Sequence, residues 1–138
     1  MLKELNVEQA RFVAILAKAA RIQRDEVLRE VGEKELVDVR PARGEHNPAA
    51  MVGLESLRSD ASQTAALRDA IASLSADARS ELYCLMRIGQ GHLAAKKWHR
   101  GITEASLLGT DTISAALVED VDLHNHLQKG LYESNLAA

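Results

Sequence analysis

Apolar residues recur at helical intervals along most of this chain, and the pattern is clearest over residues 76–89. One stripe there follows the spacing i, i+4, i+7, i+8 and i+11, and consists of Ala78, Leu82, Leu85, Met86 and Gly89. The other side of the same segment carries Tyr83, Cys84 and Ile88. A helix that is apolar nearly all round lies inside a protein. The sequence therefore predicts a central, buried helix at 76–89.

The N-terminal segment predicts a second helix with more than one apolar side. Asn6, with Gln9 three residues later, indicates an N-terminal cap. The apolar positions that follow are Phe12, Val13, Ala14, Ile15, Leu16, Ala17, Ala19 and Ala20. A helix of this kind must be covered on more than one side. We therefore expect either a deep position in the fold or a subunit contact through Phe12, Ile15 and Leu16.

Residues 24–60 are less regular. RDEVLREV continues the helical pattern, whereas ELVDVRP alternates like a short edge strand that ends at Pro41, so 24–40 is open between helix and strand, and we favour a short helix. PARGEHNP holds both prolines of the chain, and it predicts a flexible loop over 41–60 in which AAMVGLESL can form a helical turn.

The C-terminal half, over 62–132, predicts the core helices. Ser62 and Ser75 are placed to cap the first two of them, and Gly89-Gln90-Gly91 is placed to end the second. A further helix carries Trp98, Ile102, Ala105 and Leu108 on one face; another runs from Thr110 or Asp111 to near Val118, and a last one from Asp120 to about Tyr132. Residues 1–138 are thus predicted to form one all-α domain, an irregular bundle of five to seven helices.

Composition narrows the class of protein. Of 138 residues, 46% are hydrophobic and 27% charged, and the formal net charge is −3, which weighs mildly against a dedicated nucleic-acid binder. The single cysteine excludes an intramolecular disulfide and suits a reducing compartment. The first residues lack the apolar run of a signal peptide, and no segment approaches the ~20 apolar residues of a membrane span. We expect a cytoplasmic protein that does not enter a membrane.

The sequence contains no complete motif for catalysis, metal binding or cofactor binding. EDVDLHNH at 119–126 is rich in metal-binding residue types, but His124 and His126 lie about 200° apart around a helix. We therefore expect no metal site. Cys84 lies in the central apolar helix, which favours a small core residue over a nucleophile. The glycines at 89–91 lack the third glycine and the preceding strand of a dinucleotide-binding motif, so we predict no cofactor and no catalytic residue.

A basic segment runs from residue 87 to 100 without an acidic residue, and its cations are Arg87, Lys96, Lys97 and Arg100. The last three share one side of a helix, so they can bind a phosphate, an acidic protein surface or another anion. A solvated outer face opposite Trp98 and Ile102 is the alternative explanation, and we favour it over anion binding. Arg87 lies in the central helix, where a buried guanidinium needs a carboxylate or several carbonyl partners.

Three segments between Leu67 and Leu131 resemble the bacterial domain-of-unknown-function family 3775: LRDAIASLSADARSELYCLMRIGQG, KKWHRGITEA and LVEDVDLHNHLQKGL. ELYCLMRIGQG is similar to that family's leucine-rich helix with its glycine-containing turn. Gly89, Gly91 and Trp98 match the family pattern, whereas Arg87 stands where the family has tryptophan and Gln90 where it has arginine. The resemblance implies an α-helical fold and assigns no activity.

The leading functional hypothesis is a non-enzymatic helical protein-interaction or regulatory module that forms a homodimer. One alternative is weak nucleic-acid or anion binding through Arg87, Lys96, Lys97 and Arg100. Another is a small ligand-binding protein or enzyme with a pocket beside Arg87 and the Gly89–Gly91 turn.

Overall fold

The computed structural model describes residues 2–37 and 62–135. These residues form six α-helices and one short 3-10 helix, with no strand among them: α1 (Val7–Val37), α3 (Ser62–Ala72), α4 (Ala76–Gln90), η2 (Ala95–Lys97), α5 (Trp98–Leu108), α6 (Thr110–Glu119) and α7 (Leu123–Glu133). Over the described ranges, the prediction of an all-α irregular bundle of five to seven helices is confirmed. The loop predicted at 41–60 lies outside the described residues.

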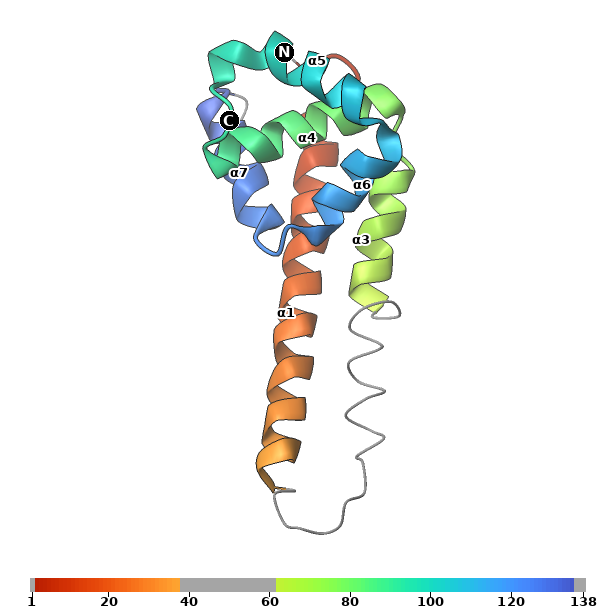
Figure 1. The fold of residues 1–138 in the computed structure, drawn as a ribbon, viewed down its shortest axis with the longest axis vertical. Coiled ribbons are helices and arrows are strands. Elements are labelled where there is room, and N and C mark those ends of the chain that lie inside the picture. Colours follow the sequence, from red (N-terminus) through yellow and green to blue (C-terminus); the bar gives the residue numbers. More distant parts are fainter. Residues whose placement is uncertain (1, 38–61, 136–138) are drawn as a thin grey trace.

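Helix α4 is the centre of the bundle, as its all-round apolar pattern predicted. It crosses the upper part of the molecule and contacts α5, α6 and α7 (Figure 1). Leu82, Cys84 and Leu85 are completely buried. The predicted cap at Ser75 is confirmed, since its hydroxyl oxygen accepts a hydrogen bond of 3.1 Å from the Ala78 N–H. Gly91 ends the helix in the left-handed conformation, with φ of 84°.

Two glycines let α4 and α7 cross with their backbones in contact. A Cβ atom added at Gly89 would lie 1.9 Å from the backbone oxygen of His126, and one added at Gly130 would lie 2.2 Å from that of Leu85. Each helix thus contributes one glycine at the point where the other helix comes closest. Gly89 lies within α4 and serves this crossing, while Gly91 alone has the helix-ending conformation predicted for the 89–91 segment.

Helix α1 is one continuous helix of 31 residues. It begins as predicted: the Gln9 N–H donates to Asn6 Oδ1 at 2.7 Å, and the Asn6 N–H donates to Gln9 Oε1 at 3.0 Å. The helical alternative for residues 24–37 is confirmed and the edge strand is wrong, although the segment continues α1 and is not a separate helix. Ser62 is the first residue of α3, and its Oγ accepts a hydrogen bond from Gln23 Nε2.

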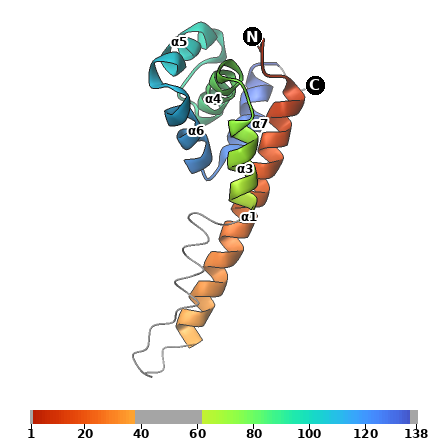
Figure 2. The ribbon, with the colours of Figure 1, turned by 90° about the vertical axis from the view of Figure 1, so that its right-hand side faces the viewer.

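The inner face of α1 packs against α3 and α7. Figure 2 shows α1 at the outer edge of the molecule, with the other helices on one side of it. Val13, Ala14 and Ala17 form the buried face. The arrangement leaves the opposite side of α1 without a neighbouring helix in the described part of the chain.

The last two helices have the predicted bounds, except that α7 begins later than predicted. α6 spans Thr110–Glu119, as predicted. α7 begins at Leu123 with Asp122 as its N-cap residue, so the predicted start at Asp120 is wrong. The Asp120 carboxylate is engaged elsewhere, because it contacts the side chains of His126 and Gln90. In α5, Trp98 and Ala105 are buried, whereas Leu108, predicted on the same face, is exposed.

Candidate functional site

The outer face of α1 exposes large apolar side chains. Phe12 is 55% exposed, Ile15 64% and Ile22 49%. Because successive residues of an α-helix are ~100° apart, these three and Ala19 fall on one stripe, opposite to the buried face of Val13, Ala14 and Ala17. We call Phe12, Ile15, Ala19 and Ile22 the outer seam. Leu16, the third predicted interface residue, is half-buried at the edge of the seam and packs against the core.

Charged residues lie at both ends of the outer seam. Glu8 and Arg11 are exposed near the start of α1, and Glu26 and Arg29 are exposed beyond Ile22. The seam is therefore an apolar strip with an acid and a base at each end, which is the pattern of an interface centre with a polar rim.

The predicted basic segment is partly neutralised within the fold. Arg87 forms an ion pair with Glu104, and Arg100 Nε lies 3.2 Å from the other oxygen of the same carboxylate. Hydrogen bonds from Arg87 and then Arg100 hold the pKa of Glu104 below its usual value. Glu104 lies four residues beyond Arg100, so the usual helical spacing of ion pairs could have revealed half of this cluster from the sequence.

The other two residues of the basic segment are placed differently. Lys96 and Lys97 belong to η2 and are exposed. The structure thus joins Arg87 and Arg100 through Glu104 and leaves the two lysines on the surface. Anion or nucleic-acid binding by the four residues stays a prediction.

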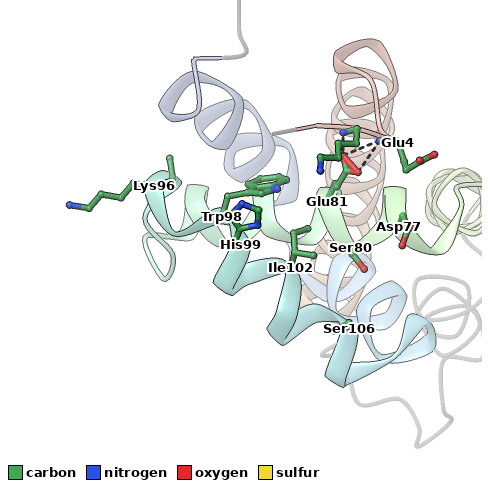
Figure 3. A pocket seen from close by; sticks show the side chains of 11 residues that line it. Glu4, Asp77, Ser80, Glu81, Lys96, Trp98, His99, Ile102 and Ser106 are labelled. Carbon is green, nitrogen blue, oxygen red and sulfur yellow. Dashed lines mark hydrogen bonds between the residues drawn. The ribbon is translucent and has the colours of Figure 1, made fainter.

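A surface pocket of about 530 Å³ lies between α4, the segment before α1, and the η2–α5 region (Figure 3). It is lined by Lys3, Glu4, Asp77, Ser80, Glu81, Ala95, Lys96, Trp98, His99, Ile102 and Ser106. Trp98, 8% exposed, and Ile102 give it an apolar wall. Figure 3 shows Asp77 and Ser80 at one end and Trp98 and His99 at the other. Arg87 and the Gly89–Gly91 turn, where a pocket was predicted, do not line this one.

Glu81, at the pocket, holds the N-terminal segment onto α4. Its side chain is buried, with the residue 5% exposed. Its carboxylate accepts hydrogen bonds from the backbone N–H groups of Lys3 at 2.6 Å, Glu4 at 3.0 Å and Leu5 at 3.5 Å. Because these partners are backbone groups more than seventy positions away, no residue pattern in the sequence signalled the contact.

A polar junction joins α1, α4 and α7. His126 Nδ1 lies 2.6 Å from Asp120 Oδ2, and Gln90 Nε2 donates to the same oxygen at 3.2 Å. Arg21 of α1 donates to Asp122 Oδ1 at 2.5 Å. Asp120 and Asp122 therefore bind side chains of helices α1, α4 and α7.

The polar junction also includes residues of the histidine-containing segment 119–126. A hydrogen bond from Asn125, aided by the charges of His126 and Arg21, lowers the pKa of Asp122. Nδ1 of His124 is buried without a hydrogen-bond partner among the described residues. Within residues 2–37 and 62–135, no three His, Cys, Asp or Glu side chains are grouped so as to hold a metal ion.

Cys84 is a core residue, as its position in the central helix predicted. It is completely buried, and a Cβ at Gly101 of α5 would lie 3.0 Å from its sulfur. Burial raises the pKa of its thiol to about 12, although the charge of Arg87 acts in the opposite direction. A thiol with this pKa supplies almost no thiolate near neutral pH, so it is a poor nucleophile.

These features define a small helical protein with a packed core, an exposed apolar helix face and a surface pocket. Residues 64–136 match the model of the family described as Protein of unknown function (DUF3775). The match covers just over half of the chain, so the protein belongs to this family, and the resemblance drawn from Leu67–Leu131 is confirmed. The comparisons with curated proteins and with solved structures gave no match. In the described ranges, no helix combines the length and apolar character needed to cross a membrane.

Proposed function

We propose that this protein is a non-enzymatic helical protein-interaction module that acts as a homodimer, and that the outer seam of α1 is its interaction surface. The supporting observation is the exposure of Phe12, Ile15 and Ile22 along one stripe of a helix whose opposite face is packed. Single exposed apolar residues are ordinary, but a contiguous stripe rimmed by charges marks an interaction site.

The size of the stripe indicates a reversible dimer. Burying the exposed half of Phe12, Ile15 and Ile22 in both copies contributes about 5–9 kcal/mol, at roughly 1.5–3 kcal/mol for each fully buried side chain. Association costs at least about 4 kcal/mol in lost translational and rotational freedom. The difference is at most about 1–5 kcal/mol, which corresponds to dissociation constants of about 0.2 mM or weaker before any contribution from charges at the rim.

Sedimentation equilibrium from about 10 µM to 1 mM reaches the tight end of this expected range. The wild-type protein should shift from monomer to dimer over these concentrations. Ile15→Glu should remain monomeric, because a charge in the seam would be desolvated on pairing. Leu107→Glu is the matched control, since Leu107 is 82% exposed on α5, away from the seam. A wild-type monomer at every concentration, or equal effects of the two variants, would contradict the proposal.

We further infer a location in the bacterial cytoplasm. The resemblance to a bacterial family supports this origin, and a chain with one fully buried cysteine suits a reducing compartment. Fractionation of the native host with an antibody to the protein would test it, since recovery in an extracytoplasmic fraction would contradict the inference.

The pocket beside Glu81 supports ligand binding as a second candidate function. Its volume of about 530 Å³ lies within the usual range of small-molecule sites, and Trp98, the single tryptophan of the chain, forms part of its wall. Any ligand that enters should therefore change the fluorescence of Trp98. We expect such a change on titration with fractionated cytosolic metabolites, and its loss in Ser80→Arg, where a long side chain occupies the pocket. A response that Ser80→Arg leaves unchanged would place the binding elsewhere.

A further inference from the structure

The segment that precedes α1 is held at the pocket by one side chain. We call this segment, residues 2–6, the strap; it is described in full and is not helical. In the described part of the chain, the hydrogen bonds of the Lys3, Glu4 and Leu5 N–H groups all go to the carboxylate of Glu81, and Figure 3 draws such bonds as dashed lines. Because the three N–H groups share one acceptor, their bonds form and break together.

The side chains of the strap have two different surroundings. Leu5 is 3% exposed, and Leu2 packs against the core from a partly buried position. Lys3 and Glu4 are exposed and line the pocket. The strap therefore forms one wall of the pocket, and two leucines together with Glu81 keep this wall in place.

Helix α1 begins independently of the contact between the strap and Glu81. Asn6 Oδ1 accepts a hydrogen bond from the Gln9 N–H at 2.7 Å, and Gln9 Oε1 accepts one from the Asn6 N–H at 3.0 Å. This capping box satisfies the first turn of α1 with groups that belong to the helix and its cap. Movement of the residues before Asn6 therefore leaves the start of α1 intact.

The packing of the bundle is also largely independent of the strap. Helix α4 contacts α5, α6 and α7, and α1 contacts α3 and α7. Release of the strap breaks the bonds to Glu81 and exposes Leu2 and Leu5, while these contacts between helices remain. A segment that buries so few apolar side chains opens at a lower free energy than the whole fold.

We propose that the strap opens and closes one side of the pocket, with Glu81 as its latch and Asn6 as the limit of the movement. In the closed arrangement Lys3 and Glu4 form part of the lining. Opening removes this wall and widens the entrance to the apolar surface of Trp98. The inference adds a moving wall to the pocket proposed as a ligand site, and the movement belongs to the protein without a ligand.

Hydrogen exchange of the ligand-free wild-type protein, followed by NMR at several low urea concentrations, tests the movement. We expect the N–H groups of Lys3, Glu4 and Leu5 to have similar protection factors, at least about 10-fold below that of the Leu85 N–H in α4. Their exchange should hardly depend on urea, because a local opening exposes little surface. Protection equal to that of Leu85 would show that the strap opens only when the whole protein unfolds, and no protection would show that it is not latched. Either result would overturn the proposal.

A matched pair of variants tests the latch. Glu81→Gln should lower the protection factors of the strap N–H groups a further 5- to 30-fold, roughly, because a neutral oxygen accepts hydrogen bonds more weakly than a carboxylate. The Ala10 N–H, which donates to the Asn6 carbonyl oxygen at 3.2 Å, should keep its protection. Asp77→Asn is the control, since it removes one charge from the same helix and the same pocket but from an exposed residue. Equal effects of the two variants on the strap, or loss of protection at Ala10 as well, would contradict the proposed latch.

The moving wall and the proposed ligand binding fail separately. A Trp98 fluorescence that no metabolite fraction changes would count against ligand binding, and the exchange pattern of the strap would still stand. Strap N–H groups that exchange only with the core would refute the moving wall, whatever the titration of Trp98 shows.

Discussion

The crossing of α4 and α7 allows a quantitative test of how this fold is packed. The perturbation is Gly89→Ala, which adds one methyl group to the centre of the crossing. The new Cβ would lie 1.9 Å from the backbone oxygen of His126 and 2.6 Å from its Cα. Backbone atoms cannot rotate aside, so the two helices must separate by roughly 1.5 Å to reach an ordinary contact distance.

Two effects of opposite sign determine how much Gly89→Ala changes the free energy of unfolding. Alanine is better than glycine inside a helix by up to about 1 kcal/mol. Overpacking a tight core costs about 1–3 kcal/mol and sometimes more. The upper end applies here, because separation of the helices loosens contacts of the fully buried Leu82, Leu85 and Leu127 together. We therefore expect Gly89→Ala to lower the free energy of unfolding by about 2–3 kcal/mol net, and Tm by about 6–12 °C.

Urea denaturation followed by circular dichroism at 222 nm, at one fixed protein concentration, measures the change. Gly130→Ala should behave alike, because its Cβ would meet the backbone oxygen of Leu85 at 2.2 Å. Gly91→Ala is the control: its φ of +84° and ψ of 11° are left-handed and the space around it is open, so only the cost of about 1–2 kcal/mol for a left-handed alanine applies. A Gly89→Ala protein as stable as the wild type would refute the close crossing.

Three further predictions concern single side chains. Glu81→Ala should lower the free energy of unfolding by about 1–3 kcal/mol, seen in the same urea titration, because the part-buried N–H groups of Lys3 and Glu4 and the buried N–H of Leu5 lose their acceptor; a neutral effect would contradict the contact. Cys84, whose thiol pKa is raised to about 12 by burial, should react with a thiol reagent at pH 8 only after unfolding; rapid reaction of the native protein would show that it is accessible. The pKa of Asp122 is lowered in the fold, first by the hydrogen bond from Asn125, so its stabilising effect should be complete above about pH 4 and lost as pH falls through the lowered value. We expect the difference in the free energy of unfolding between the wild type and Asp122→Asn, measured from about pH 7 to pH 2, to shrink over that acidic range. A difference that stays constant with pH would refute the prediction.

Local signals predicted most of the helices. The spacing of Leu82, Leu85 and Gly89 identified the central helix, and the Ser75 and Asn6 caps marked two helix starts to the residue. These features depend on residues within one or two turns of each other, so the sequence contains the information needed. The same local rule failed at Asp120: α7 begins at Leu123, and the Asp120 carboxylate contacts His126 and Gln90 instead.

The features of the candidate sites were less accessible to sequence reasoning. The pocket combines residues from three separate segments, and Glu81 binds backbone groups that any residues could supply. Gly89 was recognised as part of a stripe and a turn, but its close contact with His126 depends on how two distant helices cross. Pairing of Arg87 with Glu104 required knowing that α5 folds back along α4. Tertiary geometry determines each of these contacts.

The sequence predicted two helices with apolar residues on several sides, α1 and α4. The fold covers α4 more completely than α1, and this difference supports the proposed dimer. Helix α4 is covered over most of its surface within one chain, and Ile88, on the side opposite its main stripe, is buried. Helix α1 has neighbours, α3 and α7, along one side only, and Phe12 and Ile15 on the other side are more than half exposed. Water contact with large apolar side chains is unfavourable in either place, so an exposed apolar face favours association with a partner. For α4 the fold supplies the cover. For α1 the described fold leaves Phe12 and Ile15 exposed, and this exposure is the observation that supports the proposed dimer.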